Sequence, residues 1–130
     1  MNEPVWLGRG EVETMHEMLI QRFGGTYGVR DEGAIDSTLA HPRNKWESEK
    51  STLPDLAAAY AYGLAKNHGY VDGNKRIGFT CAAVFLDVNG HRLVVEEPEA
   101  VLTMTAVCSD EIDEAQLAAW FSEHTSAVIA

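Results

Sequence analysis

Apolar residues recur at the spacing of an α-helix along most of this chain. The first such stripe consists of Val12, Met15, Leu19 and Phe23. These residues lie three or four positions apart, which puts them on one face of a helix. Two glycines follow at positions 24 and 25 and favour a stop, because glycine is a poor helix former and a common C-terminal cap. The segment is therefore predicted to be a helix, followed by an extended turn at residues 26–30.

Five further segments show helical periodicity. Asp31 is suited to cap a short helix that carries Ile35 and Leu39 and ends before Pro42. Longer helices are predicted at residues 54–68, 74–88, 97–109 and 113–125. The predicted core-facing positions in the last three are Ile77, Cys81, Val84, Phe85 and Val88, then Val101, Met104 and Val107, then Leu117, Trp120 and Phe121.

Two segments between these helices lack that periodicity. Residues 41–53 are polar and irregular, which predicts an exposed loop. Residues 91–95 alternate, so they are predicted to form either a short strand or an extended connection. Together the elements predict an all-α protein, a single domain at residues 1–130 built as an orthogonal bundle of about six helices. The segment from residue 68 to residue 74 would lie where the two central helices meet.

The charge balance narrows the range of partners. The chain has 10 Lys and Arg against 20 Asp and Glu, a formal net charge of −10. A protein that binds a nucleic-acid backbone needs a cationic surface, so no direct nucleic-acid partner is expected. The acidity is concentrated in residues 96–123, which contain no lysine or arginine. This stretch is either a solvated helical face or a docking surface for a basic partner.

The sequence also bears on the compartment. No apolar run approaches the roughly 20 residues that a membrane helix needs, and no signal peptide is visible after Met1. A cytoplasmic protein with no membrane partner is therefore expected. Cys81 and Cys108 fall far apart inside predicted helices, so they are expected to be small core residues rather than a disulfide. No Cys and His spacing is typical of a zinc site.

The most informative segment is His-Gly-Tyr-Val-Asp-Gly-Asn-Lys-Arg-Ile-Gly at residues 68–78. Gly73 permits a tight turn, and the helix that follows leaves backbone N–H groups free at its start. Such groups, together with the helix dipole, bind anions. Lys75 and Arg76 oppose the dipole there, which is unfavourable unless an anion is bound. A phosphate site is therefore predicted at Gly73, Asn74, Lys75 and Arg76.

Two other side chains of this segment suit phosphate chemistry. Asp72 alone would be an ordinary turn residue, but beside phosphates its carboxylate is a candidate ligand for Mg²⁺. His68 alone would more often cap the preceding helix, but beside such a site its imidazole could take a proton from a substrate hydroxyl. Asn74 also has a simpler interpretation, as a helix cap.

The pattern His-x-Tyr-x-Asp-Gly-Asn-Lys-Arg at residues 68–76 resembles the signature of Fic-fold proteins. Residues 23–43 and 56–67 also resemble sequences of the death-on-curing (Doc) branch. Two departures from the general Fic pattern point to that branch. Lys75 stands where most Fic proteins have glycine, and Phe79 stands where they have a second arginine. The resemblance implies a single Fic/Doc domain with a Fic-type helical bundle.

The resemblance also implies a role for each motif residue. His68 would be the general base, Asp72 the metal ligand, Asn74 a residue that positions phosphate or metal, and Arg76 the clamp on the phosphates. Fic proteins with glycine at the position of Lys75 typically transfer AMP. Doc toxins instead transfer the γ-phosphate of ATP to a threonine of elongation factor Tu, which halts translation. The expected activity is that of a kinase using Mg²⁺ and ATP. The alternatives are AMP transfer or a non-catalytic antitoxin-binding protein.

Partners follow from the same resemblance. The self-inhibiting Ser/Thr-x-x-x-Glu-Gly/Asn motif of many Fic proteins does not occur in this sequence. Inhibition is therefore expected from another chain, as Doc toxins of type II toxin–antitoxin modules are held by an antitoxin's C-terminal segment that folds on binding. Its expected seat is a groove along the first helix. Residues 41–53 match the family's flap, in which Trp46 is either a local anchor or a contact for the target.

Overall fold

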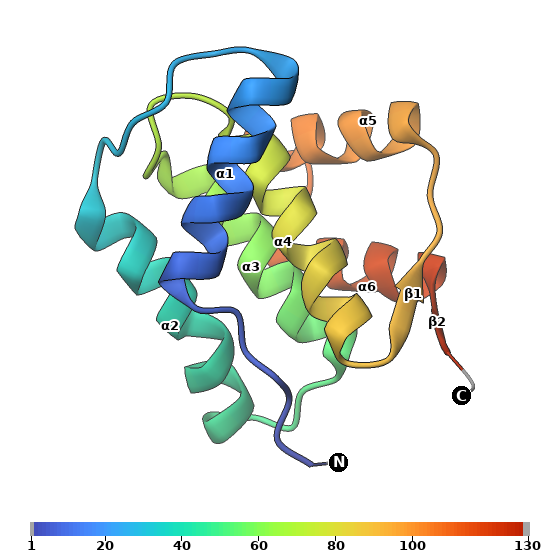
Figure 1. Cartoon of the computed structure of the whole chain (residues 1–130). Helices are drawn as coiled ribbons and strands as arrows, with labels where there is room; N and C mark the ends of the chain where they lie inside the picture. The colour runs from blue at the N-terminus through green and yellow to red at the C-terminus, as the bar shows by residue number, and fades with distance from the viewer. Residues whose placement is uncertain (1, 129–130) are drawn as a thin grey trace.

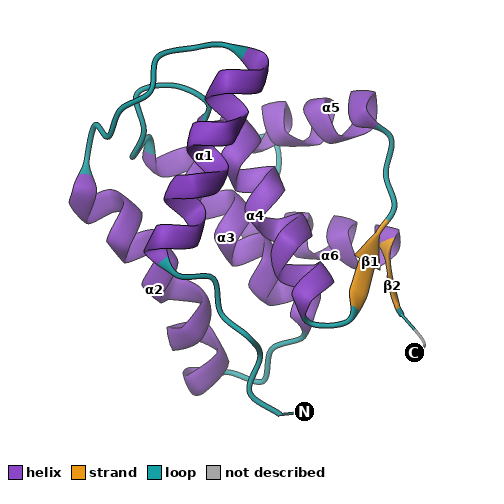
Figure 2. Ribbon diagram, in the orientation of Figure 1, coloured by secondary structure: helices purple, strands orange, loops and turns teal. Residues whose placement is uncertain are grey.

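The structure, a computed structural model, describes residues 2–128. Within these residues the chain forms six α-helices (Figure 1) and one two-stranded antiparallel ribbon (Figure 2). The elements are α1 (Arg9–Phe23), α2 (Glu32–Ser48), α3 (Leu53–Asn67), α4 (Asn74–Val88), β1 (His91–Leu93), α5 (Glu97–Cys108), α6 (Glu114–His124) and β2 (Thr125–Ala127). The prediction of an all-α bundle of about six helices is confirmed.

Helices α3 and α4 pack along each other at the centre of the bundle (Figure 1). The alanine-rich α3 is buried over most of its length, and its small side chains let α4 approach closely. A β-carbon at Gly78 of α4 would lie only 2.8 Å from the carbonyl oxygen of Ala61. Helices α2 and α6 pack on α3, and α1 packs on α4. Both ends of the loop at residues 68–73, between α3 and α4, are therefore fixed by the core.

Helix α2 is longer than predicted. It begins after the predicted cap Asp31, whose carboxylate accepts the N–H of Ala34 at 3.0 Å, but it continues through Pro42 to Ser48. The prediction of an exposed loop at residues 41–53 was therefore wrong, and only residues 49–52 separate α2 from α3. Proline within a helix removes a backbone hydrogen bond and crowds the preceding turn. Here Pro42 is buried, and this burial offsets the local penalty.

Trp46 is a local anchor near the end of α2. Its ring meets that of Trp6 edge-on, with centroids 6.1 Å apart, and Trp6 in turn stacks on the core residue Phe85 at 5.9 Å. The guanidinium of Arg43 lies 5.5 Å from the centroid of the Trp6 ring. This cluster ties α2 to the N-terminal segment and to α4, which accounts for a tryptophan in so polar a stretch.

The chain after α4 forms a short ribbon. Gly90, with φ 82°, adopts the left-handed conformation just after α4. β1 then pairs antiparallel with β2, with Leu93 opposite Thr125. The strand interpretation of residues 91–95 is thus confirmed for residues 91–93. The last helix was predicted to reach residue 125, but it ends at His124 because Thr125 begins β2.

Burial confirms most of the predicted core, with three corrections. Val88 and Val101 were expected to face the core, yet 46% and 57% of their surfaces are exposed. Phe23, at the end of the first stripe, is also exposed. In α4 the buried face includes Leu86 in place of Val88. No helix within residues 2–128 is long and apolar enough to cross a membrane.

Candidate functional site

The segment at residues 68–78, where a phosphate site is predicted, contains the loop between α3 and α4. This loop is shown in lime green beside the end of α1 in Figure 1. Two residues with left-handed backbone angles bound this loop. His68, at φ 49° and ψ 45°, ends α3, and Gly73, at φ 77°, precedes α4. Glycine adopts this conformation freely, but for histidine it costs on the order of 1 kcal/mol. Such strain is most often found where function requires a particular backbone path.

Gly69 fastens the start of the loop to the segment before α2. Its carbonyl oxygen accepts the N–H groups of Arg30 at 2.8 Å and of Asp31 at 3.0 Å. A β-carbon at this position would collide with the buried side chain of Ile35. Only glycine therefore allows the loop to lie so close to α2.

Asn74 holds the other end of the loop. Its Oδ1 accepts the N–H of Tyr70 at 3.1 Å, and its Nδ2 donates to the carbonyl oxygen of Tyr70 at 3.0 Å. The N–H of Val71 also donates to the carbonyl of Gly28 at 3.0 Å. The Asn74 side chain thus shapes the loop from the first position of α4. The predicted contact of Asn74 with phosphate or metal stays a prediction.

The ring of Tyr70 is buried beneath the loop. It stacks on the buried ring of His16 with centroids 3.8 Å apart, and its hydroxyl donates to Glu13 Oε1 at 3.1 Å. His16 Nε2 lies 2.8 Å from the carbonyl oxygen of Asp72. Because a carbonyl oxygen can only accept, Nε2 carries the hydrogen of this bond. His16 therefore supports the loop from below at the peptide before Gly73.

Sequence reasoning missed His16, although a signal was present. His16 lies one turn after Val12 and next to Met15, so it belongs to the apolar face of the first helix. A histidine on such a face is buried and needs a hydrogen-bond partner. The partner itself, a carbonyl 56 positions further along the chain, could not be identified from local pattern.

Glu13 joins α1 to the same cluster. Its carboxylate accepts hydrogen bonds from Arg9 Nε at 2.7 Å and from the hydroxyls of Tyr70 and Tyr27, each at 3.1 Å. Burial alone would raise the pKa of Glu13, but these three hydrogen bonds and the charge of Arg9 together lower it below its ordinary value. Burial and the neighbouring Glu13 carboxylate raise the pKa of Tyr70. Glu13 is thus ionised and Tyr70 neutral at pH 7.

Asp72 is exposed and oriented by one hydrogen bond, since its Oδ2 accepts the N–H of Thr26 at 2.7 Å. Within residues 2–128 no group of three or more His, Cys, Asp or Glu side chains could hold a metal ion on its own. Magnesium commonly takes one or two carboxylates and completes its shell with water and phosphate oxygens. The donor set therefore fits a magnesium ion that arrives with phosphates, with Asp72 as the one carboxylate.

Lys75 and Arg76 are exposed on the first turn of α4, which contains no acidic residue. Neither forms an ion pair with any other residue of the described part of the chain. The guanidinium of Arg76 instead lies 4.1 Å from the centroid of the Phe23 ring. Two uncompensated cations at the positive end of a helix repel each other and the dipole. Their arrangement favours an anionic ligand.

These residues border a pocket of about 580 Å³ between α4 and the elements α1, β1 and α5. Its lining consists of Leu19, Phe23, Gly73, Asn74, Lys75, Arg76, Phe79, Thr80, Ala83, Leu93, Val95, Glu97, Ala100, Val101, Met104 and Thr105. The four predicted phosphate residues are all included. Most of the remaining wall is apolar, so the pocket offers a cationic part and a hydrophobic part. We call it the motif pocket.

The structure therefore brings Gly73, Asn74, Lys75 and Arg76 together in the motif pocket. His68 and Asp72 lie on the adjoining loop and are not part of the lining. His68 is exposed, so its ring is accessible to a substrate. Cys81 lies in the core, where burial raises the pKa of its thiol to about 12. It is accordingly protonated at neutral pH and unsuited to act as a nucleophile.

Comparison with known proteins identifies the family of this chain. A family model described as the Fic/DOC family matches residues 6–86. This is more than half of the chain, and the chain belongs to the Fic/DOC family. The match includes the whole loop and most of α4, so the residues that shape the motif pocket on this side are part of the family match.

Two curated relatives are Doc proteins, which confirms the predicted branch. The chain is 41% identical over 76 residues to Toxin Doc of Mycolicibacterium smegmatis (strain ATCC 700084 / mc(2)155), a match that covers 57% of this chain and 58% of that protein. It is 28% identical over 109 residues to Protein kinase doc of Escherichia phage P1, covering 83% and 86%. The chain thus spans little more than half the length of the first of these relatives.

Proposed function

We propose that this protein is a Doc-type toxin that binds ATP with Mg²⁺ at the motif pocket and transfers the γ-phosphate to a protein hydroxyl. The observation that carries the proposal is the pair Lys75 and Arg76, two exposed cations without an ionic partner among residues 2–128, at the start of α4. Free N–H groups and positive charge at a helix start favour phosphate. The relatives' names, a toxin and a protein kinase, support this interpretation.

In the proposed complex, the phosphates lie against Gly73, Asn74, Lys75 and Arg76. The apolar side chains from α1, β1 and α5 receive the base, since ligand pockets combine a hydrophobic wall with a few polar groups that fix orientation. Asp72 would hold a magnesium ion, which would supply positive charge beside the phosphates. A helix start, two cations and one carboxylate supply the positioning and the electrostatics that phosphoryl transfer requires.

His68 acts as the general base in this proposal. Its exposed imidazole accepts the proton of the target hydroxyl as the hydroxyl oxygen bonds to the γ-phosphorus. The bond between that phosphorus and the oxygen bridging to the β-phosphate breaks, and ADP leaves. Histidine suits the task, because a neutral imidazole ring has one nitrogen with a free lone pair that can accept this proton. No covalent intermediate with the protein is needed.

The proposed target is a threonine of elongation factor Tu, whose modification would halt translation. ATP and this factor are both cytoplasmic, so the proposed reaction requires a cytoplasmic location. Inhibition would come from the C-terminal segment of a cognate antitoxin that folds on the toxin. The motif pocket reaches α1 through Leu19 and Phe23, and Met18 on α1 is exposed by 62%. The groove along α1 is the proposed seat of the antitoxin.

Incubation of the purified chain with elongation factor Tu and ATP tests the proposal directly. Label from γ-labelled ATP, and a mass increase of one phosphate on a threonine, are expected. Label only from α-labelled ATP would replace the kinase by an AMP transferase, which Gly73 at the Fic glycine position would also allow. No modification with either label would leave a protein that binds an antitoxin or a nucleotide without catalysis.

His68→Ala isolates the role of the base, and His41→Ala is its matched control. His41 is an exposed histidine on α2 whose Nε2 lies 3.2 Å from Glu114 Oε2, remote from the motif loop in sequence. The first variant should lose label transfer by roughly 10²–10⁴-fold, the usual contribution of a general base, while the second retains it. Equal rates in both variants would remove His68 from the mechanism.

A further inference from the structure

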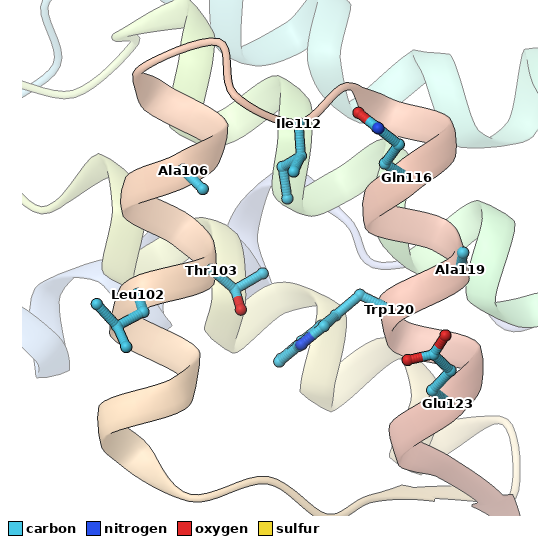
Figure 3. A pocket seen from close by; sticks show the side chains of 8 residues that line it. All are labelled: Leu102, Thr103, Ala106, Ile112, Gln116, Ala119, Trp120 and Glu123. Carbon is cyan, nitrogen blue, oxygen red and sulfur yellow. The ribbon is translucent and has the colours of Figure 1, made fainter.

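Helices α5 and α6 leave a second hollow between them, with a volume of about 470 Å³ (Figure 3). Leu102 and Ala106 of α5, Ile112 of the connecting loop and Trp120 of α6 form its apolar walls. Figure 3 shows Trp120 reaching across from α6 toward α5, with Glu123 one turn further along α6. We call this hollow the α5–α6 groove.

The α5–α6 groove is distinct from the motif pocket. The motif pocket uses Ala100, Val101 and Met104 of α5, whereas the groove uses Leu102 and Ala106. At 100° per residue these two sets lie on opposite faces of the helix. α5 therefore separates two hollows, and a ligand in one leaves the other open.

The groove exposes apolar surface that the core does not use. α5 packs against α3 and α4, and part of its surface toward α6 stays open at the groove. Leu102, on the side facing the groove, exposes 71% of its surface. The indole of Trp120 is only partly covered, and its Nε1 donates to Glu99 Oε2 at 3.2 Å. A contiguous apolar patch of this kind often marks an interaction surface.

The surroundings of the groove are acidic. Residues 96–123 contain eight carboxylates and no lysine or arginine. Lysines pair with two of them, Asp110 with Lys66 and Glu114 with Lys45, and Glu99 Oε2 lies 2.6 Å from His124 Nε2. Five have no ion pair among residues 2–128. Of these, Glu123 lines the groove, and Glu111 and Asp113 adjoin Ile112 in the sequence.

We propose that the α5–α6 groove is a docking surface for a short amphipathic helix of another protein, with lysines and arginines flanking its apolar stripe. Charge complementarity selects this occupant, because a second copy of this chain, a nucleic acid or an anionic membrane would each bring more negative charge. The 12 residues of α5 span about 18 Å, which suits about three turns of a bound helix. The apolar walls would receive its stripe, and the carboxylates would pair with its edges.

A synthetic helical peptide of leucine and lysine, with the leucines on one face, serves as the probe. Two controls have the same length: a scrambled peptide without an apolar face, and one with glutamate in place of lysine. Titration calorimetry and ¹⁵N NMR of the chain's tryptophan indoles report affinity and location. We expect the basic amphipathic peptide to bind, more weakly as salt rises, and to shift the indole signal of Trp120 more than those of Trp6 and Trp46.

Substitutions locate the site. The pair Leu102→Ser and Glu123→Lys changes two exposed residues of the groove, so the fold should be kept. The matched pair, Val5→Ser and Glu47→Lys, makes comparable changes at exposed positions outside both the groove and α1. Binding should weaken at least tenfold in the groove pair and less than twofold in the matched pair.

Four results would overturn the proposal. The first is that the basic amphipathic peptide does not bind, and the second is that the glutamate peptide binds equally well. The third is that both variant pairs lose the same affinity for the basic peptide. The fourth is that the chain self-associates and that the groove pair of substitutions abolishes this self-association. The third result would show that overall charge, and not the groove, drives binding. The fourth would make the groove a contact between two copies.

Discussion

The Nε2 atom of His16 lies 2.8 Å from the carbonyl oxygen of Asp72, although 56 positions separate the two residues in the sequence. This hydrogen bond joins α1 to the motif loop at the peptide immediately before Gly73. The His16 side chain that makes this hydrogen bond is completely buried. The backbone that carries the proposed metal ligand is therefore positioned by a residue on another helix.

Replacing His16 by phenylalanine should destabilise the protein more than replacing it by glutamine. Phenylalanine can keep the stacking on Tyr70, but it leaves the carbonyl of Asp72 without its donor, at a cost of about 1–3 kcal/mol in the free energy of unfolding. The glutamine Nε2 can still donate to that carbonyl. Urea unfolding of both variants measures the difference. Equal losses would mean that His16 contributes packing alone.

Glu13 should make stability depend on pH. Its folded pKa lies below the ordinary value of 4.5, so its contribution is fully present above about pH 4.5 and is lost as the pH falls through the lower folded pKa. Glu13→Gln should remove this part of the acid dependence. Thermal melts from about pH 7 to about pH 3 check it, with Glu17→Gln, an exposed position on the same helix, as control. Identical pH profiles for the two variants would contradict the assignment.

The polar cluster of Glu13, His16 and Tyr70 beneath the loop could not be predicted from local sequence patterns. The helices around it, the cap at Asp31 and the stop after Phe23 follow from periodicity and capping, which act over a few residues. The contacts of Glu13 with Tyr70, and of His16 with Asp72, join segments more than 50 positions apart. Such contacts depend on how the helices pack, and a single sequence does not record that.

The full length of α2 was also missed because it depends on tertiary contacts. Proline and a polar composition predict a break at residues 41–53, and both are local signals. Burial of Pro42 and the contact of Trp46 with Trp6 are tertiary effects, and they outweigh those signals. In contrast, the glycine, the cations and the carboxylate of the motif could be identified from the sequence, because the chemistry of a phosphate site depends on residue types that are adjacent along the chain.

Gly78→Ala should destabilise the bundle although alanine is the better helix former. A β-carbon there would lie 2.8 Å from the carbonyl oxygen of Ala61 and 3.4 Å from the backbone nitrogen of Ala65. Backbone atoms of α3 cannot move aside, so α4 must shift, and overpacking of this kind costs about 1–3 kcal/mol. Gly10→Ala in α1 meets nothing within 4 Å. It should stabilise by about 0.5–1 kcal/mol. Urea unfolding compares them, and a stabilised Gly78→Ala would mean that α3 and α4 are packed less closely.

Arg76→Ala should weaken ATP binding by roughly 10- to 150-fold, corresponding to about 1.5–3 kcal/mol for a hydrogen bond between charged groups. Arg76 lines the motif pocket, and its guanidinium lies over Phe23, within reach of a ligand placed between α1 and α4. Titration calorimetry with ATP in the presence of Mg²⁺ measures the change. The loss should be smaller at high salt, because screening already weakens the interaction in the unmodified protein.

Arg22→Ala is the matched control for this effect. Its guanidinium also lies over the ring of Phe23, 5.3 Å from the centroid, but Arg22 belongs to α1 and is not part of the pocket lining. Removing it deletes the same formal charge and the same type of aromatic contact without touching the start of α4. ATP affinity should therefore change by less than about twofold, as expected of an exposed and screened charge. Equal losses in both variants would show that overall charge drives binding. No loss in either variant would mean that the phosphates do not bind at the start of α4. The proposed nucleotide site would then be wrong.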